Sequence, residues 1–275
     1  MAEIESPTDY IATISGVTAC LDAISKWQAT NGIKTEQQFF SAVWFRGNGR
    51  VHPIPLRPGV YRDEFKKIAE HMHGKDLETK RLNTELRMLD EFRAAGAGFL
   101  NSADAVDVYF TAQHYGMPTR LLDWTTNPLA ALFFAVENKH LHGENGELFV
   151  MDANKVLPDD SGAKYKIWGI VGIRNPYTAA AIGESFWIWH KRQPLVIPVL
   201  PDNRPGRIGQ QNSRFTLHMH NAPPAQNKTL AKMKIPADSK PRILEDLHRL
   251  NVNEFTTYND LDHLSKGIRR AWGID

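Results

Sequence analysis

The chain has 275 residues, of which 42% are hydrophobic and 23% charged, a composition typical of a folded globular protein. Its net charge of +2 excludes a polybasic chain but leaves room for one local basic groove. The single cysteine, Cys20, excludes an internal disulfide and a zinc site made of several thiolates. The first residues lack the basic and apolar parts of a signal peptide, and no apolar run approaches the ~20 residues that span a bilayer. We therefore expect a soluble, cytoplasmic protein with no membrane partner.

The first half of the chain is expected to contain helices on either side of one buried strand. Apolar residues at intervals of three and four predict a helix over 16–28. The aromatic and β-branched run at 39–45 predicts a buried strand, followed by a basic turn at 46–50. The polar, charged stretch over 62–91 is expected to be mostly helical.

The second half is expected to be richer in strands. Asp104 is a predicted helix cap, and Pro128 is suited to the first position of an apolar, buried helix that runs to Val136. Short extended runs predict strands at 147–151, 194–199, 214–220 and 233–235, and two helices are expected to close the chain at 239–250 and 259–272. We expect one domain over 1–275, with a helical N-terminal segment of about 1–38 and a mobile insertion at 152–184.

Arg46 is the first candidate site residue, because it leaves a predicted buried strand beside glycines. Guanidinium donors form a fork that suits an anion, and Gly47 would let a phosphate approach the backbone. The alternative, of equal weight from spacing alone, is that Arg46 pairs with an internal carboxylate.

Residues 112–128 hold the densest group of polar side chains in the sequence. They contain a histidine, a tyrosine, an arginine, an aspartate, a tryptophan and three threonines between two apolar helices. Polar groups packed between buried elements must bond to one another or to a ligand. In the structural alternative Asp123 pairs with Arg120 and Thr126 caps the next helix. That alternative explains less well why His114, Tyr115 and Trp124 gather there.

Other motifs carry less information. The polar run 207–216, with Gln210 and Gln211, precedes a predicted strand and is also what a solvated loop looks like. Two His-Met-His triplets, at 71–73 and 218–220, have no cysteine or carboxylate at ligand spacing. We therefore expect no metal site.

These motifs resemble a known family. The tripeptide Phe45-Arg46-Gly47, the run 112–135 and residues 207–216 look like the FRG domain, which is named for its Phe-Arg-Gly motif. The resemblance covers roughly residues 20–270. FRG proteins look like components of mobile, phage-related gene sets, which implies a toxin or phage-defence role and an antitoxin or immunity partner.

A looser similarity is to the ADP-ribosyltransferase fold, which carries an early arginine, a polar strand followed by a helix, and a later glutamate. Arg46 matches the arginine, Trp124-Thr125-Thr126 matches the polar strand, and Gln211 falls at the glutamate. A glutamine cannot offset the positive charge of an oxocarbenium-like transition state as a carboxylate can. Asp123 is therefore the first candidate for that charge, and Glu184 the second.

This similarity implies an α+β fold with an ADP-ribosyltransferase-like, split antiparallel sheet and flanking helices. It also implies NAD as a substrate, bound by Arg46, Gly47, His114, Tyr115, Arg120, Trp124 and Thr125, with Arg46, Asp123 and Gln211 as the catalytic residues. The implied activity is ADP-ribosyl transfer to a nucleic-acid or protein acceptor, or NAD glycohydrolysis if the acceptor is water. The alternative, which explains the missing glutamate directly, is a non-catalytic module that binds a nucleotide or a partner.

Overall fold

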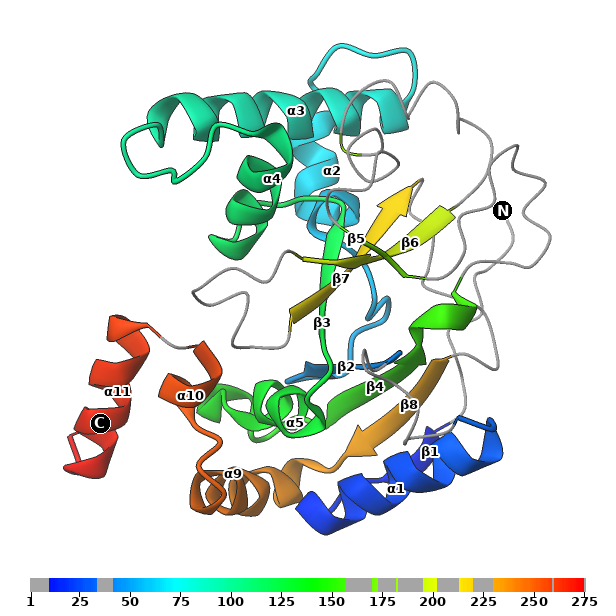
Figure 1. The fold of residues 1–275 in the computed structure, drawn as a ribbon, viewed down its shortest axis with the longest axis vertical. Coiled ribbons are helices and arrows are strands. Elements are labelled where there is room, and N and C mark those ends of the chain that lie inside the picture. The colour runs from blue at the N-terminus through cyan, green and yellow to red at the C-terminus, as the bar shows by residue number, and fades with distance from the viewer. Residues whose placement is uncertain are drawn as a thin grey trace.

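A mixed sheet with flanking helices forms the computed structural model, which describes residues 10–33, 42–156, 170–172, 182, 195–201, 213–219, 230–258 and 260–274 (Figure 1). In these residues eight strands form one sheet in the order β1-β8-β4-β2-β3-β7-β6-β5. The strands are β1 (Tyr10–Thr13), β2 (Val43–Asn48), β3 (Leu121–Thr125), β4 (Gly146–Asp152), β5 (Val171–Gly172), β6 (Leu195–Leu200), β7 (Ser213–Met219) and β8 (Leu230–Ile235). β1 with β8 and β5 with β6 run parallel, and the other neighbours run antiparallel.

The helices lie along the sheet and beyond its ends. They are α1 (Val17–Thr30), α2 (Asp63–Ala69), α3 (Leu77–Ala95), α4 (Ala105–His114), α5 (Pro128–Val136), α9 (Lys240–Arg249), α10 (Glu254–Tyr258) and α11 (Leu261–Ala271). Short 3-10 turns are η2 (Gly59–Tyr61), η3 (Lys139–Leu141), η4 (Ala153–Lys155) and η5 (Ala237–Ser239). The structure confirms the expectation of a mixed fold in which helices flank a sheet. Among the described residues, no helix combines the length and hydropathy needed to cross a bilayer.

The sheet consists of two halves that meet between β2 and β3. Among the described residues, these two strands are matched at one position, where Phe45 lies opposite Thr125. By contrast, β2 is matched to β4 along all of Val43–Asn48, and β3 to β7 along all of Leu121–Thr125. The two halves are therefore β1-β8-β4-β2 and β3-β7-β6-β5, and Figure 1 shows them running at different angles.

Each half has its own layer of helices. Apolar side chains of α1, α5 and α9 pack on β2, β4 and β8. Side chains of α3 and α4 pack on β3, β6 and β7. A third cluster joins the halves, since Trp44 and Phe149 of one half pack with Leu122 and Trp124 of the other.

Several elements differ from the sequence predictions. β2 continues through Arg46 and Gly47, where a turn was predicted, because β4 pairs with it to its end. The stretch 62–91 holds two helices, separated before Asp76, which caps α3 by accepting a hydrogen bond from the Thr79 N–H. The N-terminal segment begins with strand β1 before its helix. The expected insertion at 152–184 lies largely outside the described residues.

Gly47 is required by the packing of α5 on β2. A Cβ atom added to Gly47 would lie 1.9 Å from the Ala131 carbonyl oxygen and 2.9 Å from the Ala135 nitrogen. The space on that side of the glycine is therefore filled by helix backbone, whereas the sequence analysis assigned it to a phosphate. This close contact sets α5 directly against the Phe-Arg-Gly tripeptide.

Candidate functional site

A cleft of about 430 Å³ lies beside the junction of the two half-sheets. This volume falls within the ~300–1,000 Å³ typical of small-molecule sites. β2 contributes Arg46, β3 contributes Asp123, and the residue before α2 is Arg62. The other lining residues are Gly59, Glu64, Phe65, Ile68, Met88, Gln113, Gly116, Met117, Pro118, Leu121 and Leu122. The cleft thus joins residues that are far apart in the chain.

Arg46 reaches across the junction from one half-sheet to the other. Its Nη1 donates a hydrogen bond to the backbone carbonyl of Asp123 at 2.8 Å. Its Nε is buried and has no hydrogen-bond partner among the described residues. A buried guanidinium nitrogen left without an acceptor is costly. An anion bound in the cleft is one partner that would supply the missing acceptor.

The charge around Arg46 also favours an anion. Burial lowers the pKa of Arg46, the charge of Asp123 raises it, and the charge of Arg62 lowers it again, for a net decrease. A net decrease means that the negative charge of Asp123 does not fully offset the cost of burying the guanidinium cation. A negatively charged ligand between Arg46 and Arg62 would restore the balance.

The Asp123 carboxylate is held in place by an amide. Gln113 Nε2 donates to Asp123 Oδ2 at 2.8 Å, and Thr119 Oγ1 donates to Gln113 Oε1 at 2.5 Å. The Asp123 side chain is exposed to the cleft although protein surrounds it. Burial raises the pKa of Asp123, and Arg46, Gln113 and His114 oppose the increase. Thr119 and Gln113 therefore fix the direction of a carboxylate that solvent or ligand can reach.

The wall that carries Arg62 is anchored to the start of β3. The Val60 N–H donates to the Thr119 carbonyl at 3.3 Å. A Cβ on Gly59 would lie 2.8 Å from the Cα of Pro118. η2, which leads into α2, is thus packed tightly on the segment before β3.

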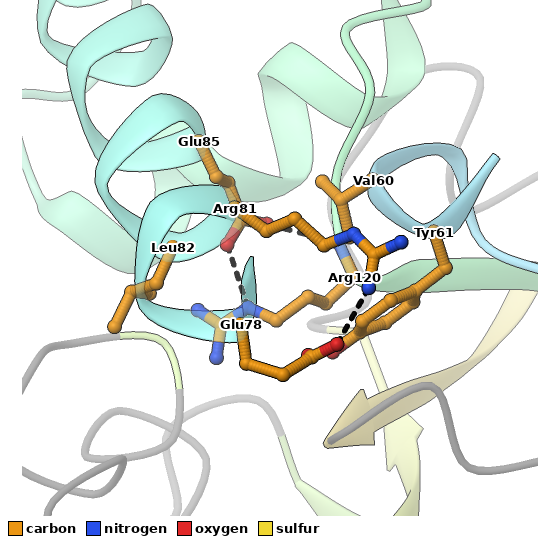
Figure 2. Close-up of a pocket in the computed structure, with 7 residues that line it drawn as sticks. All are labelled: Val60, Tyr61, Glu78, Arg81, Leu82, Glu85 and Arg120. Carbon is orange, nitrogen blue, oxygen red and sulfur yellow. Dashed lines mark hydrogen bonds and ion pairs between the residues drawn. The ribbon is translucent and has the colours of Figure 1, made fainter. Parts of the chain in front are cut away.

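Arg120 lies outside the cleft and anchors α3 to β3 (Figure 2). Its Nε donates to Glu85 Oε2 at 2.6 Å, and its backbone N–H donates to Glu85 Oε1 at 2.9 Å. Tyr109 donates to the same carboxylate at 2.7 Å. Burial lowers the pKa of Arg120, but Glu85, Tyr109 and Tyr61 together more than offset this, so the pKa is raised. The pairing of Asp123 with Arg120 that the structural alternative predicted does not occur, because Glu85 takes that place.

Figure 2 also shows why this interior is not a binding pocket. Arg81 donates to Glu78 and lies over the Tyr61 ring, 5.5 Å from its centroid. The space between these side chains is too small to admit a water molecule. The network is therefore a structural joint that holds η2, α3 and β3 together.

Trp124 and Thr125 are also placed in the interior. Trp124 is 3% exposed and donates from Nε1 to Thr216 Oγ1 at 3.0 Å. Thr125 Oγ1 accepts a hydrogen bond from the Asn127 N–H. Asn127, rather than Thr126, caps α5, because its side chain accepts from the first two free N–H groups of the helix. Neither Trp124 nor Thr125 lines the cleft.

The remaining predicted residues lie at its margin or beyond the described residues. His114 and Tyr115 end α4, with ring centroids 5.2 Å apart in an edge-on contact, and Tyr115 is 72% exposed. Neither side chain is among those that line the cleft. Gln211 and Glu184 fall outside the described residues.

Arg62 and Gln113 are cleft residues that were missed from the sequence. Arg62 stood in a charged stretch that was expected to be mostly helical, and Gln113 was part of a motif but was given no role. Gln113 is close to Asp123 in the sequence, and this closeness could have indicated that the two side chains interact. Arg62 had no such signal, because the turn η2 brings it to β3 from far away in the sequence.

One cluster in the described part of the chain has the geometry of metal ligands. The donor atoms of Asp260, Asp262 and His263 lie within 4.8 Å of one another. Asp260, however, caps α11 by accepting from the His263 N–H. This local capping role accounts for the cluster.

Comparison with known families agrees with the Phe-Arg-Gly motif. Residues 41–144 match the family model of the FRG domain. This range, which we call the FRG segment, contains all of the described residues that line the cleft. No curated protein and no solved structure matches the chain. The similarity to ADP-ribosyltransferases therefore remains a hypothesis.

Proposed function

We propose that the cleft of the FRG segment binds NAD and that the protein is an ADP-ribosyltransferase-like enzyme. The observation that carries this proposal is the meeting of Arg46 and Asp123. They come from opposite half-sheets, line one cleft and are joined by a hydrogen bond, while Arg46 Nε has no hydrogen-bond partner in the described part of the chain. The division of the sheet between β2 and β3 is a further support, because the resemblance implies a split sheet.

In this proposal Arg46 holds the pyrophosphate of NAD by charge-assisted hydrogen bonds. The bond between the nicotinamide nitrogen and the ribose carbon breaks, and its electron pair leaves with neutral nicotinamide. The ribose carbon then carries positive charge, which the Asp123 carboxylate offsets. An acceptor oxygen or nitrogen attacks that carbon and loses its proton. Gln113 keeps the carboxylate in place, and Gln211 remains a candidate for contact with the acceptor.

The acceptor would be a nucleic acid or a protein, or water in a glycohydrolase. A toxin or phage-defence role, with an antitoxin or immunity partner, rests on the FRG resemblance. A second candidate function is a binding module that takes up a nucleotide or a partner without chemistry. It is favoured by the burial of Trp124 and Thr125, because these residues are not available to position the ribose.

The test is release of nicotinamide from NAD by the purified protein, with and without cell lysate, alongside direct measurement of NAD binding. Arg46→Ala removes the proposed phosphate contact. Arg87→Ala is the matched control, because its side chain is 68% exposed on α3 and does not line the cleft. We expect release by the wild type and the control, and none by Arg46→Ala.

The outcomes separate the candidates. Release that needs lysate indicates a transferase, and release without lysate indicates a glycohydrolase. Binding without release, lost in Arg46→Ala, supports the binding module. Absence of both release and binding in the wild type would contradict the proposal as a whole.

A further inference from the structure

The cleft is lined by two chemically different groups of side chains. Arg46, Gln113 and Asp123 are linked by hydrogen bonds and form its polar end, which Leu121 and Leu122 of β3 also line. Phe65 and Ile68 of α2 form its apolar end, where Glu64 directly precedes Phe65 in the chain. Met88 and Met117 add two flexible, polarisable side chains from α3 and from the segment after α4. Such side chains adapt well to the face of an aromatic ring.

Arg62 lines the same cleft. Its charge is close enough to Arg46 to lower the pKa of that residue. It is also the residue before α2, so Phe65 lies three positions and Ile68 six positions further along. The chain therefore leads from the arginines at the polar end to the apolar side chains within two turns of one helix.

The apolar end is accessible to a ligand. Ile68 is 56% exposed, although it is a large apolar side chain on a helix. Phe65 below it is 3% exposed and packs with Val60, Tyr61 and Ala69, against which Met88 also lies. Ile68 therefore leaves apolar surface in the cleft that a ligand can contact, beside a packed base.

From this order of groups we propose that the cleft binds an adenine dinucleotide in one orientation. The adenine lies against Ile68 and Met88, the pyrophosphate lies between Arg62 and Arg46, and the nicotinamide ribose lies at Asp123. The apolar end is thus an adenine subsite. This inference rests on the proposed function for the identity of NAD, but it predicts binding of ADP whether or not the protein turns NAD over.

The test measures binding of ADP, nicotinamide mononucleotide and inorganic pyrophosphate by calorimetry, and the KM for NAD. Ile68→Gln removes apolar surface at the adenine subsite and keeps a residue that favours helix. Ile54→Gln is the matched control, since Ile54 is 54% exposed and does not line the cleft. A thermal unfolding measurement on each variant establishes that the fold is retained.

We expect ADP to bind and to compete with NAD. Ile68→Gln should weaken ADP binding about tenfold, which is within the range for lost apolar contact in a pocket. It should leave binding of pyrophosphate unchanged, and Ile54→Gln should change neither. Arg62→Ala should weaken both ADP and pyrophosphate.

Three results would overturn the inference. The first is that ADP does not bind, or that Ile68→Gln does not weaken its binding. The second is binding of nicotinamide mononucleotide that depends on Ile68 as strongly as binding of ADP does, which would place the other ring at the apolar end. The third is turnover of NAD with an unchanged KM in Ile68→Gln, in which case the orientation fails and the proposed function stands. If ADP binds through Ile68 but NAD releases no nicotinamide, the proposed function fails and the adenine subsite stands.

Discussion

Replacing Glu85 by glutamine tests the joint between α3 and β3. The carboxylate accepts from Tyr109, from the Arg120 backbone N–H and from Arg120 Nε, and the Glu85 and Arg120 side chains are 1% and 2% exposed. In the variant, the amide oxygen can still accept hydrogen bonds from the Arg120 backbone N–H and from Tyr109. The amide NH₂ group then faces Arg120 Nε, which is also a donor. The guanidinium is then left without its counter-charge in the interior.

Removing one partner of a buried ion pair costs about 3–5 kcal/mol. With about 2–4 °C per kcal/mol for a chain of this general size, the melting temperature should fall by roughly 6–20 °C. Glu91→Gln is the matched control on the same helix, because Glu91 pairs with Arg87 and both side chains are 68% exposed. For that variant we expect a loss of about 0–1 kcal/mol.

The assay is thermal unfolding followed by circular dichroism, supported by urea titration of each variant. The reasoning would be refuted if Glu85→Gln lost no more stability than Glu91→Gln. A double variant, Glu85→Leu with Arg120→Met, is compared with the two single variants Glu85→Leu and Arg120→Met. It should lose less stability than the sum of the two, because replacing both partners avoids an unpaired charge.

Three further predictions concern other parts of the fold. Gly47→Ala should lower the free energy of unfolding by about 1–3 kcal/mol or more, because a Cβ meets the Ala131 carbonyl at 1.9 Å; unchanged stability by urea titration would contradict this packing. Burial raises the pKa of Glu137 from 4.5 to about 7, so its contribution to stability is present at low pH and is lost as the pH rises from 4.5 through about 7. Glu137→Gln should therefore gain melting temperature relative to the wild type as the pH increases from 5 to 8, and a constant difference would argue against it. Burial raises the pKa of the Cys20 thiol to about 12, so a maleimide should label it only after denaturation, and rapid labelling of the native protein would contradict the burial.

The sequence predicted those elements whose signals are local. Asp104 caps α4, as expected, and Pro128 opens α5. β1 and β3 escaped prediction from periodicity because each is short and is defined by its neighbours in the sheet. A strand of this length has few residues with which to show alternation, so its pairing partners decide its state.

The site was predicted in part, for a related reason. Arg46 and Asp123 were singled out from their types and positions, and the structure brings them together. Arg120 was predicted to bind the ligand because it lies in the same motif. Its side chain instead pairs with Glu85, which lies on a helix far away in the sequence. A long-range pair of this kind leaves no local signal in one sequence. Arg62 was missed for the same physical reason.

The single match between β2 and β3 has a consequence for how the molecule would respond to a ligand. Each half-sheet has its own helices and its own apolar cluster, so the two can be regarded as units whose cooperativity depends on their shared boundary. A nucleotide that contacts Arg46 on one side and Asp123 on the other would link the two half-sheets across that boundary. Binding would then do more than raise the stability of the folded state. It would protect amide hydrogens on both sides of the junction from exchange, and it would make the two units unfold as one.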